Sequence, residues 1–296
     1  MPATKVALVG GSGNLGPAIL HELLNAGFGV KVLTRQSGNN TFDLRAQIAK
    51  VDYESLESLK AALAGNEVMV NTLGVGTIPR DTHLRLIDTA VAVGVKRYLP
   101  SKYSLNTTHP NTAKLPVFGD KIAVQQRLKN VSQQSGLTYS LLVNGLFLDW
   151  GLKTGFLLDL SSPVTLYDSG DRKFSATTLS GVGKAMVGII NNLSATENTT
   201  VFVHEAIVSQ KEILALSGRS PMTKSVQTSE LEQEAFAKLS KPAPDPLVFA
   251  FGFLRRAIFG EGFGSLFDSQ KLSNDLFGLK TFSEEDLRGL ISKITG

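Results

Sequence analysis

Residues 10–16, GGSGNLG, form a run of glycines directly after the apolar segment Val6–Val9. An apolar run followed by glycines predicts a short buried strand that ends in a tight turn. We expect Gly11 to supply backbone angles that a Cβ would block, Gly13 to let the main chain approach a ligand, and Gly16 to let the next helix pack closely. The N-terminus of that helix would present free N–H groups, so the segment predicts a pyrophosphate-binding site.

The spacing of these glycines fits two related dinucleotide-binding patterns. Gly11-x-Gly13-x-x-Gly16 is the general form, and Gly10-x-x-Gly13-x-x-Gly16 is the variant of many short-chain reductases. The expected strand before the glycines and the helix after them supply the context that the pattern requires. The residues expected to contact the dinucleotide here are Gly10, Gly11, Ser12, Gly13, Asn14, Leu15 and Gly16.

The end of the second expected strand indicates which dinucleotide is bound. This strand spans residues 29–33 and is followed by Thr34 and Arg35, where an NAD enzyme usually carries an acidic residue for the ribose 2′-hydroxyl. A guanidinium can pair with a 2′-phosphate, which a carboxylate would repel. We therefore predict NADP(H) as the cofactor; the alternative interpretation is that Arg35 is an ordinary surface arginine.

Further strand ends carry polar or small residues that could meet the cofactor. Strands are expected near residues 48–51, 67–71, 96–99 and 138–143, and ligands of open α/β sheets collect at the carboxyl ends of the strands. Asp52 could meet the adenine edge or could be a turn residue beside the following helix, and the sequence leaves both open. The other expected cofactor contacts are Thr72, Leu73, Gly74, Pro100, Ser101, Lys102, Asn144 and Phe147.

Strand and helix patterns alternate regularly over residues 1–150, which predicts the α/β class. We expect a Rossmann-like, doubly wound parallel sheet there. Residues of about 176–208 are expected to contribute a further strand or helix to it. Residues 151–296 are expected to form a smaller α/β substrate-binding lobe. The remaining expected elements are helices at 55–64, 80–93, 118–134, 181–191, 209–217 and 229–240, strands at 164–167, 172–175 and 200–204, and a last helix that begins near Ser283.

The segment 247–267 is rich in phenylalanine. We expect a helix that packs on the first domain, and also a lid that suits flat ligands, because aromatic side chains line many ligand sites. Glycines near its end predict that part of this lid is irregular or mobile. The phenylalanines are Phe249, Phe251, Phe253, Phe259, Phe263 and Phe267, and the glycines are Gly260, Gly262 and Gly264.

The composition is that of a soluble globular protein, with 296 residues, 42% of them hydrophobic and 19% charged. Without cysteine the chain can form no disulfide, thiolate nucleophile or cysteine–zinc site. The first strand begins close to Met1 and no segment is apolar enough to span a membrane, so we expect a cytoplasmic monomer or homodimer with no membrane partner. The net charge is +4 with scattered basic residues, which argues against a nucleic-acid partner.

The residue patterns of hydrolases and metalloenzymes are absent. A Gly-x-Ser-x-Gly elbow at Ser12 would need glycine where Asn14 stands, and there is no His-Glu-x-x-His motif. The four histidines lie far apart in the sequence, so no metal site is expected.

Lys121 is the first candidate for a catalytic side chain, with Tyr103 as the second. The tyrosine that ordinary short-chain reductases place four residues before their lysine is absent, because Val117 stands there. A partly desolvated lysine near a helix N-terminus has a lowered pKa and can donate a proton or stabilise negative charge on a substrate oxygen. The alternative is a solvated helix lysine.

Several of these segments together resemble the isoflavone reductase-like (NmrA-like) atypical short-chain dehydrogenases/reductases. The resemblance covers about residues 1–190, and one segment, NGLFLDWGL at 144–152, resembles the fungal members. It implies a Rossmann-like domain, NADPH as cofactor, a smaller substrate domain from the last third of the chain, and Lys121 as the match of the family's catalytic lysine, with Gly10, Gly13, Gly16 and Arg35 as cofactor contacts. The other segments that carry it are VGGSGNLG at 9–16, Thr34-Arg35, VKRYLPS at 95–101 and FGDKIAVQQRL at 118–128.

One segment departs from the family pattern. Members commonly have Pro-Ser-Glu-Phe-Gly where this chain has Pro100-Ser101-Lys102-Tyr103-Ser104, so the charge beside the expected nicotinamide is reversed. The reversal fits a different substrate, a different acid such as Tyr103, or lost activity. Two functions follow: an NADPH-dependent reductase of a small aromatic or polyketide-like metabolite, or a non-catalytic NADP-binding sensor that acts through a protein partner. The retained Lys121 and the phenylalanine-rich segment favour the reductase.

Overall fold

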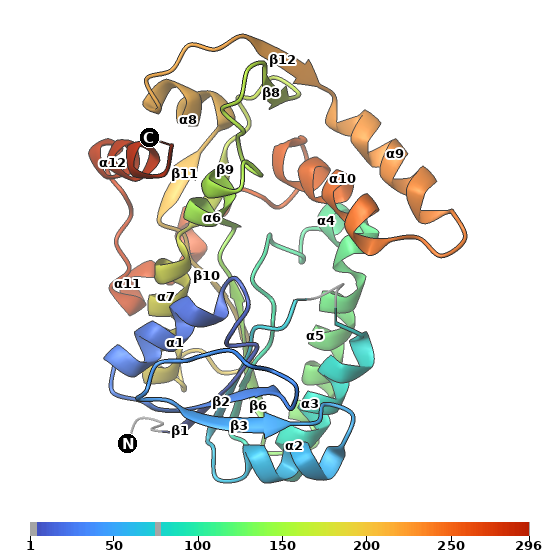
Figure 1. Ribbon diagram of the computed structural model, residues 1–296, viewed down its shortest axis with the longest axis vertical. Coiled ribbons are helices and arrows are strands. Elements are labelled where there is room, and N and C mark those ends of the chain that lie inside the picture. Colours follow the sequence, from blue (N-terminus) through green and yellow to red (C-terminus); the bar gives the residue numbers. More distant parts are fainter. Residues whose placement is uncertain (1–4, 75–77, 296) are drawn as a thin grey trace.

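The computed structural model describes residues 5–74 and 78–295 of the chain. Figure 1 shows an elongated molecule, with one large sheet in its lower half and two small sheets in its upper half. The N-terminal end lies at the bottom, beside the large sheet, and the C-terminal end lies near the upper left.

The large sheet has seven strands within the described residues, and every neighbouring pair is parallel. From edge to edge the order is β10-β6-β5-β4-β1-β2-β3, so the chain reverses its winding direction between β1 and β4. A crevice is expected at the carboxyl ends of the two strands where the direction reverses. The strands are β1 Lys5–Val9, β2 Gly29–Arg35, β3 Gln47–Val51, β4 Val68–Asn71, β5 Arg97–Leu99, β6 Thr138–Val143 and β10 Thr199–Phe202.

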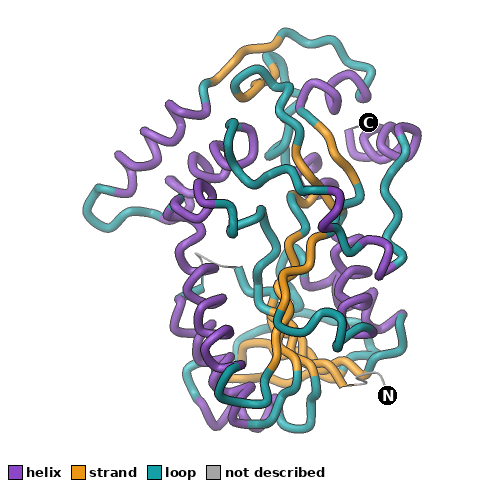
Figure 2. The backbone as a smooth tube through the Cα atoms, turned by 180° about the vertical axis from the view of Figure 1, so that it is seen from behind, coloured by secondary structure: helices purple, strands orange, loops and turns teal. Residues whose placement is uncertain are grey.

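Helices cover both faces of this sheet (Figures 1 and 2). Successive residues of β1 point to opposite sides: Val6 and Leu8 belong to the core on one face, and Ala7 and Val9 to the core on the other. Strands buried on both faces are apolar throughout, as the run Val6–Val9 is. One face is covered by α1 Gly16–Asn25 and α7 Leu179–Asn191, and the other by α2 Leu56–Leu63, α3 Arg80–Ala92 and α5 Gly119–Ser132.

A third apolar core fills the upper half of the molecule. Three strands pair in the order β11-β9-β7, and two more pair as β12-β8. The strands are β7 Leu146–Phe147, β8 Val164–Tyr167, β9 Phe174–Thr177, β11 Ala206–Val208 and β12 Thr223–Val226. The helices are α4 Pro110–Lys114, α6 Leu148–Lys153, α8 Gln210–Leu216, α9 Thr228–Leu239, α10 Pro246–Phe259, α11 Asn274–Phe277 and α12 Glu284–Thr295, with 3₁₀ turns at Pro116–Phe118 and Ser269–Lys271.

The predicted doubly wound parallel sheet is confirmed, and a later strand and helix of the chain lie on it. β10 pairs with β6, and α7 begins where Thr178 caps it by accepting the Gly181 N–H at 3.0 Å. The short elements α4, α6, α11, β7, β11 and β12 were not predicted, because they are too brief to show a periodic pattern. The strands on either side of residues 168–171 do not pair with each other: β8 pairs with β12, and β9 with β11.

The phenylalanine-rich segment forms a helix that ends at Phe259 and packs into the upper core. Phe253 and Phe259 are fully buried there, whereas Phe251 is 42% exposed. The stretch 260–264 is irregular, as expected, but it is held by hydrogen bonds to the segment 106–112; the Gly264 N–H, for example, donates to Thr112 Oγ1 at 2.9 Å. The segment therefore forms a packed helix, but the core that it joins is the upper one, which it shares with Leu115 and Phe118 of the first 150 residues.

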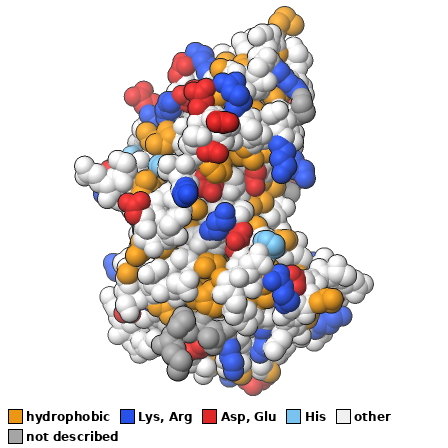
Figure 3. Space-filling model, turned by 90° about the vertical axis from the view of Figure 1, so that its left-hand side faces the viewer, with side chains coloured by type: hydrophobic (Ala, Val, Ile, Leu, Met, Phe, Trp, Pro, Cys, Tyr) orange, Lys and Arg blue, Asp and Glu red, His pale blue; other side chains and the backbone are white. Residues whose placement is uncertain are grey.

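Charges of both signs are mixed on the surface shown in Figure 3. Most ion pairs join exposed side chains, such as Arg45 with Asp43 and Arg127 with Asp88. Such pairs contribute little to stability.

Among the described residues, no helix combines the length and the apolar character that a bilayer crossing requires.

Two phenylalanines on one helix test whether α10 belongs to the core. We expect Phe253→Ala to lower the free energy of unfolding by about 3–5 kcal/mol, because it removes a fully buried ring and leaves a cavity. Phe251→Ala, on the more exposed side, should lower it by less than about 1.5 kcal/mol. Urea denaturation of both variants measures the difference, and equal losses would contradict the assignment.

Candidate active site

A cleft of about 490 Å³ opens where the carboxyl ends of β1, β2 and β4 meet the start of α3. The strand register brings these ends level, since Val9 pairs with Leu33 on one side and with Asn71 on the other. The cleft therefore lies at the reversal of winding, where the fold predicts a ligand. The predicted contacts that line it are Gly10, Gly11, Ser12, Gly13, Thr34, Arg35, Thr72, Leu73 and Gly74.

The glycine turn is locked against the loop that follows β4. Both the backbone N–H and the hydroxyl of Thr72 donate to the carbonyl of Val9, each at 2.8 Å. A Cβ on Gly10 would lie 2.7 Å from Thr72 Oγ1, and Gly10 has φ +83°. The expectation that Gly11 supplies the unusual backbone angles is wrong: Gly10 supplies them, and Gly11 is needed because a Cβ there would lie 2.8 Å from Val32 Cγ1.

The start of α1 lies directly behind the turn. A Cβ on Gly16 would lie 2.3 Å from the carbonyl oxygen of Gly10, so only glycine permits this close packing. Leu15 is buried in the core and Asn14 is exposed, and neither lines the cleft. Within the described residues no side chain caps the first turn of α1, and its Gly16 and Ala18 N–H groups remain available to an anion, because Pro17 has no N–H and the Ile19 N–H donates to the Leu15 carbonyl.

Arg35 lies at the rim of the cleft with an exposed side chain. Among the described residues, none forms an ion pair or hydrogen bond with its guanidinium. Glu54 also lines the cleft, but its carboxylate is paired with Arg85 at 3.0 Å, so its negative charge is compensated. This rim therefore favours an anionic group close to Arg35.

Asp52 is held as a turn residue. Its Oδ1 accepts the Glu54 N–H at 2.9 Å, and its own N–H donates to Ser58 Oγ at the start of α2. The next residue, Tyr53, lines the cleft instead and donates its hydroxyl to the Leu33 carbonyl at 3.1 Å. Tyr53 and Glu54 could have been predicted from their place after a strand end. The lining residues that were not predicted are Leu33, Asn40, Phe42, Tyr53, Glu54, Ile78, Pro79 and Thr82.

Lys121 lies on the first turn of α5 and is half-buried. Its ammonium donates to the carbonyls of Ser101 at 3.1 Å and Tyr103 at 3.3 Å, in the loop that follows β5. Burial lowers the pKa of Lys121 to about 7, and the positive charge of Lys102 acts in the same direction. A lysine with this pKa holds or releases a proton near neutral pH.

Lys102 occupies the position at which the resemblance led us to expect an acidic residue. Its side chain is only 2% exposed. It donates to Gln125 Oε1 at 2.9 Å and to Thr107 Oγ1. Burial lowers its pKa to about 8. Lys102 is thus a satisfied buried group whose charge acts on Lys121, and together with Pro100, Ser101 and Lys121 it lines a small cavity below the loop.

His83 of α3 lines the same small cavity and was not predicted as a site residue. It is 1% exposed, and its Nδ1 lies 3.2 Å from the amide nitrogen of Asn71, which also donates to the Tyr98 hydroxyl at 3.1 Å. Asn71 Oδ1 accepts the N–H of Leu73, a cleft residue, at 3.0 Å. Burial, and after it the charge of Lys121, lowers the pKa of His83 to about 4. A polar network therefore joins the cleft wall to the surroundings of Lys121.

Three further predicted residues line neither the cleft nor the small cavity at Lys121. Tyr103 is buried in the core, its hydroxyl has no hydrogen-bond partner among the described residues, and burial raises its pKa strongly. Asn144 is fully buried; its amide donates to the Gly145 carbonyl at 3.3 Å, and its Oδ1 has no partner. Phe147 packs partly against the core of the large sheet. Their roles toward a cofactor or substrate stay predictions.

The chain belongs to the NmrA-like family, whose model matches residues 2–260. The oxidoreductase poxI of Penicillium oxalicum is 32% identical over 212 residues, which are 69% of this chain and 65% of that relative. The match thus spans slightly less than two thirds of the relative's length. The oxidoreductase aprR of Aspergillus flavus is 30% identical over 247 residues, 80% of this chain and 82% of that protein.

Solved structures share the whole fold. AtPrR2 with NADP⁺ and (+)-pinoresinol superposes with a TM-score of 0.80 at 19% identity, and covers 99% of both chains. The ternary complex of leucoanthocyanidin reductase from Vitis vinifera gives a TM-score of 0.75 at 19% identity, over 99% of this chain and 100% of the other. At these identities the likeness establishes the arrangement of strands and helices.

Alanine substitutions at two glycines of the turn should distinguish a glycine needed for packing from a glycine needed for ligand approach. We expect Gly16→Ala to reduce both the free energy of unfolding and NADPH binding, because its Cβ cannot avoid the Gly10 carbonyl. In Gly13→Ala the nearest atom to the new Cβ is 3.5 Å away, so stability should change by less than about 1 kcal/mol while NADPH affinity falls. Thermal unfolding and calorimetric titration measure the two properties, and a Gly13→Ala variant with unchanged affinity would contradict the ligand-approach role.

The lowered pKa of Lys121 predicts a pH dependence of stability. Its pKa is about 7 in the folded protein against 10.5 for an ordinary lysine, so the unfolded chain binds more protons between those values and stability rises with pH across that window. Lys121→Met should raise the free energy of unfolding near pH 7 and flatten its increase toward pH 9. Lys129→Met, at the exposed end of the same helix, should leave the slope unchanged; an unchanged slope in Lys121→Met would show that this amine is not desolvated.

Proposed function

We propose that this protein is an NADPH-dependent reductase that transfers a hydride to an electrophilic carbon of a small aromatic or polyketide-like metabolite. The observation that carries the proposal is the half-buried Lys121 ammonium, held by the carbonyls of Ser101 and Tyr103 in the loop after β5 and lining a small cavity together with His83. The oxidoreductase relatives and the reductase structures with NADP⁺ or NADPH support the same class.

The cleft fits a dinucleotide on the grounds of its own geometry. The turn at Gly10, Gly13 and Gly16 offers main-chain N–H groups and an uncapped helix start to a pyrophosphate. The unpaired guanidinium of Arg35 would hold a 2′-phosphate, and Tyr53 and Phe42 provide apolar surface for the adenosine half. In this assignment residues 1–150, with β10 and α7, form the cofactor-binding part, and most of residues 151–296 form the substrate-binding part.

Bound NADPH supplies the hydride, and the protein supplies position and a proton. At neutral pH part of the Lys121 population is protonated, so its ammonium can donate a proton to the substrate oxygen that gains electron density. The carbonyls of Ser101 and Tyr103 orient the amine, and the charge of Lys102 makes it a stronger acid. Tyr103 holds its own proton firmly, so we assign the acid role to Lys121 and leave Tyr103 to pack the site.

A Lys121→Ala variant tests the assignment with a panel of aromatic ketones, enones and lignan-type compounds. For any compound that wild-type protein reduces, we expect kcat to fall about 10²- to 10⁴-fold, while the dissociation constant of NADPH changes only a few-fold. Lys129→Ala, on the same helix, should reduce the compound at the wild-type rate. Loss of NADPH absorbance measures turnover.

Full turnover by Lys121→Ala would contradict the acid role of Lys121. The reductase itself would be contradicted if wild-type protein binds NADPH, oxidises it with no compound of the panel, and captures a specific protein partner in a manner that depends on the cofactor. That second result would favour the NADP-binding sensor instead.

A further inference from the structure

A second cleft, of about 480 Å³, lies in the upper half of the molecule between α6, the loop 154–159 and α10. It shares no lining residue with the glycine cleft or with the cavity at Lys121. Its volume suits a small organic molecule. Aromatic side chains dominate its wall, namely Trp150, Phe156, Tyr167 and Phe251.

The rings of this wall form a continuous surface. Trp150 and Phe156 have centroids 6.2 Å apart, and Phe156 and Phe251 are 5.7 Å apart. Both distances lie in the range of favourable aromatic pairs. Phe251 is 42% exposed although it is a large apolar side chain, so part of this surface remains uncovered in the protein.

One cation, Arg255 of α10, is set into this aromatic wall. Its guanidinium carbon lies 5.2 Å from the centroid of Tyr167, 5.9 Å from Phe251 and 6.0 Å from Phe156. All three distances are within the range of cation–π contacts. Yet its Nε is buried without a hydrogen-bond partner, and among the described residues no carboxylate is paired with it.

The neighbouring Arg256 is an arginine whose hydrogen-bond partners lie within the protein. Arg256 donates its Nε to Glu232 Oε2 at 2.9 Å and its Nη1 to Thr228 Oγ1 at 3.0 Å. Arg255 has no such partners within the described part of the chain, although burying an unsatisfied charged donor is unfavourable. Its Nη groups are not buried in the same way as Nε, so they are the donors that a ligand acceptor in the cleft can reach.

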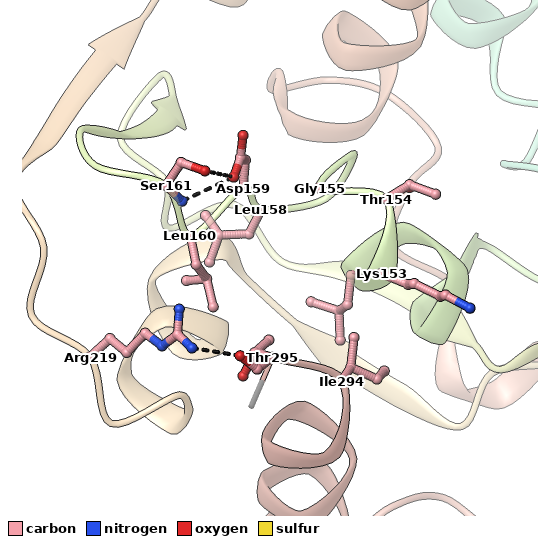
Figure 4. A pocket seen from close by; sticks show the side chains of 11 residues that line it. Lys153, Thr154, Gly155, Leu158, Asp159, Leu160, Ser161, Arg219, Ile294 and Thr295 are labelled. Carbon is pink, nitrogen blue, oxygen red and sulfur yellow. Dashed lines mark hydrogen bonds between the residues drawn. The ribbon is translucent and has the colours of Figure 1, made fainter.

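Other polar groups of the cleft are already engaged. Gln210 donates to the Leu157 carbonyl at 2.9 Å and accepts the Tyr167 N–H at 2.7 Å. Asp159, at the rim, accepts the N–H and the hydroxyl of Ser161 on one oxygen, at 2.9 and 2.7 Å (Figure 4). Figure 4 shows the adjoining hollow, where Arg219 is occupied by the carbonyl of Thr295. Among the residues that line this cleft, Arg255 is therefore the cation that can receive an anionic group.

We propose that this second cleft binds a small planar aromatic anion, with its rings on the wall of Trp150, Phe156 and Phe251 and its carboxylate or phenolate on Arg255. A planar acid matches both halves of the site, because a guanidinium donates in its plane to a carboxylate and the rings offer flat apolar surface. The proposal requires no catalysis and does not depend on the reductase assignment.

Trp150 gives a direct readout, because it is the single tryptophan of the chain and lines this cleft. We would titrate the protein with 4-nitrobenzoate, whose nitroaromatic ring quenches tryptophan fluorescence, and in parallel with the neutral 4-nitrobenzyl alcohol. Free N-acetyltryptophanamide corrects for absorption and random collisions. We expect saturable quenching by the acid, and at least about tenfold weaker affinity for the alcohol.

Four variants locate the site. Arg255→Gln should weaken 4-nitrobenzoate at least about tenfold and remove its advantage over the alcohol, and Phe251→Ala should weaken both probes. Arg256→Gln and Lys121→Ala should bind 4-nitrobenzoate as wild type does. Quenching that never saturates, equal affinity for acid and alcohol, or wild-type affinity in Arg255→Gln would overturn the proposal, as would lost binding in Lys121→Ala. Far-ultraviolet circular dichroism checks whether each variant is folded. If Arg255→Gln is not folded, Phe251→Ala supplies the second test.

Discussion

The contact between the end of β1 and the loop after β4 determines the rest of this structure. Two hydrogen bonds from Thr72 to the Val9 carbonyl join the loop after β4 to the end of β1, where the winding of the sheet reverses. With Thr72 in this place, only glycine fits at position 10. Gly16 then brings α1 against the carbonyl group of Gly10 in the turn. These three segments meet within van der Waals distance of one another. Backbone N–H groups, and not a side chain, therefore face the open cleft at this point. The chemistry we assign depends on this backbone arrangement.

The second constraint is electrostatic. Two lysines, 102 and 121, are placed close together under the loop after β5, and both have lowered pKa values because burial disfavours their charged forms. Where the family resemblance led us to expect an acid, this chain has Lys102, which donates hydrogen bonds to Gln125 and Thr107. The reversed charge acts in the same direction as burial and lowers the pKa of Lys121 further. His83 and Asn71 connect this region with the cleft, so changes in either are expected to reach the other.

The sequence predicted the large sheet well because its strands are short apolar runs that each precede a helix pattern, and glycine spacing marked the turn. It placed the residues at the ends of β1, β2 and β4 correctly in one cleft. It could not assign the unusual backbone angles to Gly10 instead of Gly11, because that choice depends on the distant Thr72. Nor could it find His83 or the pairing of Glu54 with Arg85, since both depend on how α3 packs. The short upper strands lacked periodicity, and their pairing is set by tertiary contacts.

The central claim is that the glycine turn and Arg35 together hold a phosphorylated dinucleotide, and calorimetric titration with NADPH and NADH tests it most directly. The account predicts that wild-type protein binds NADPH at least about tenfold more tightly than NADH, and that Arg35→Gln loses this preference while it still binds NADH. Absence of NADPH binding, or equal or tighter binding of NADH by the wild-type protein, would contradict it.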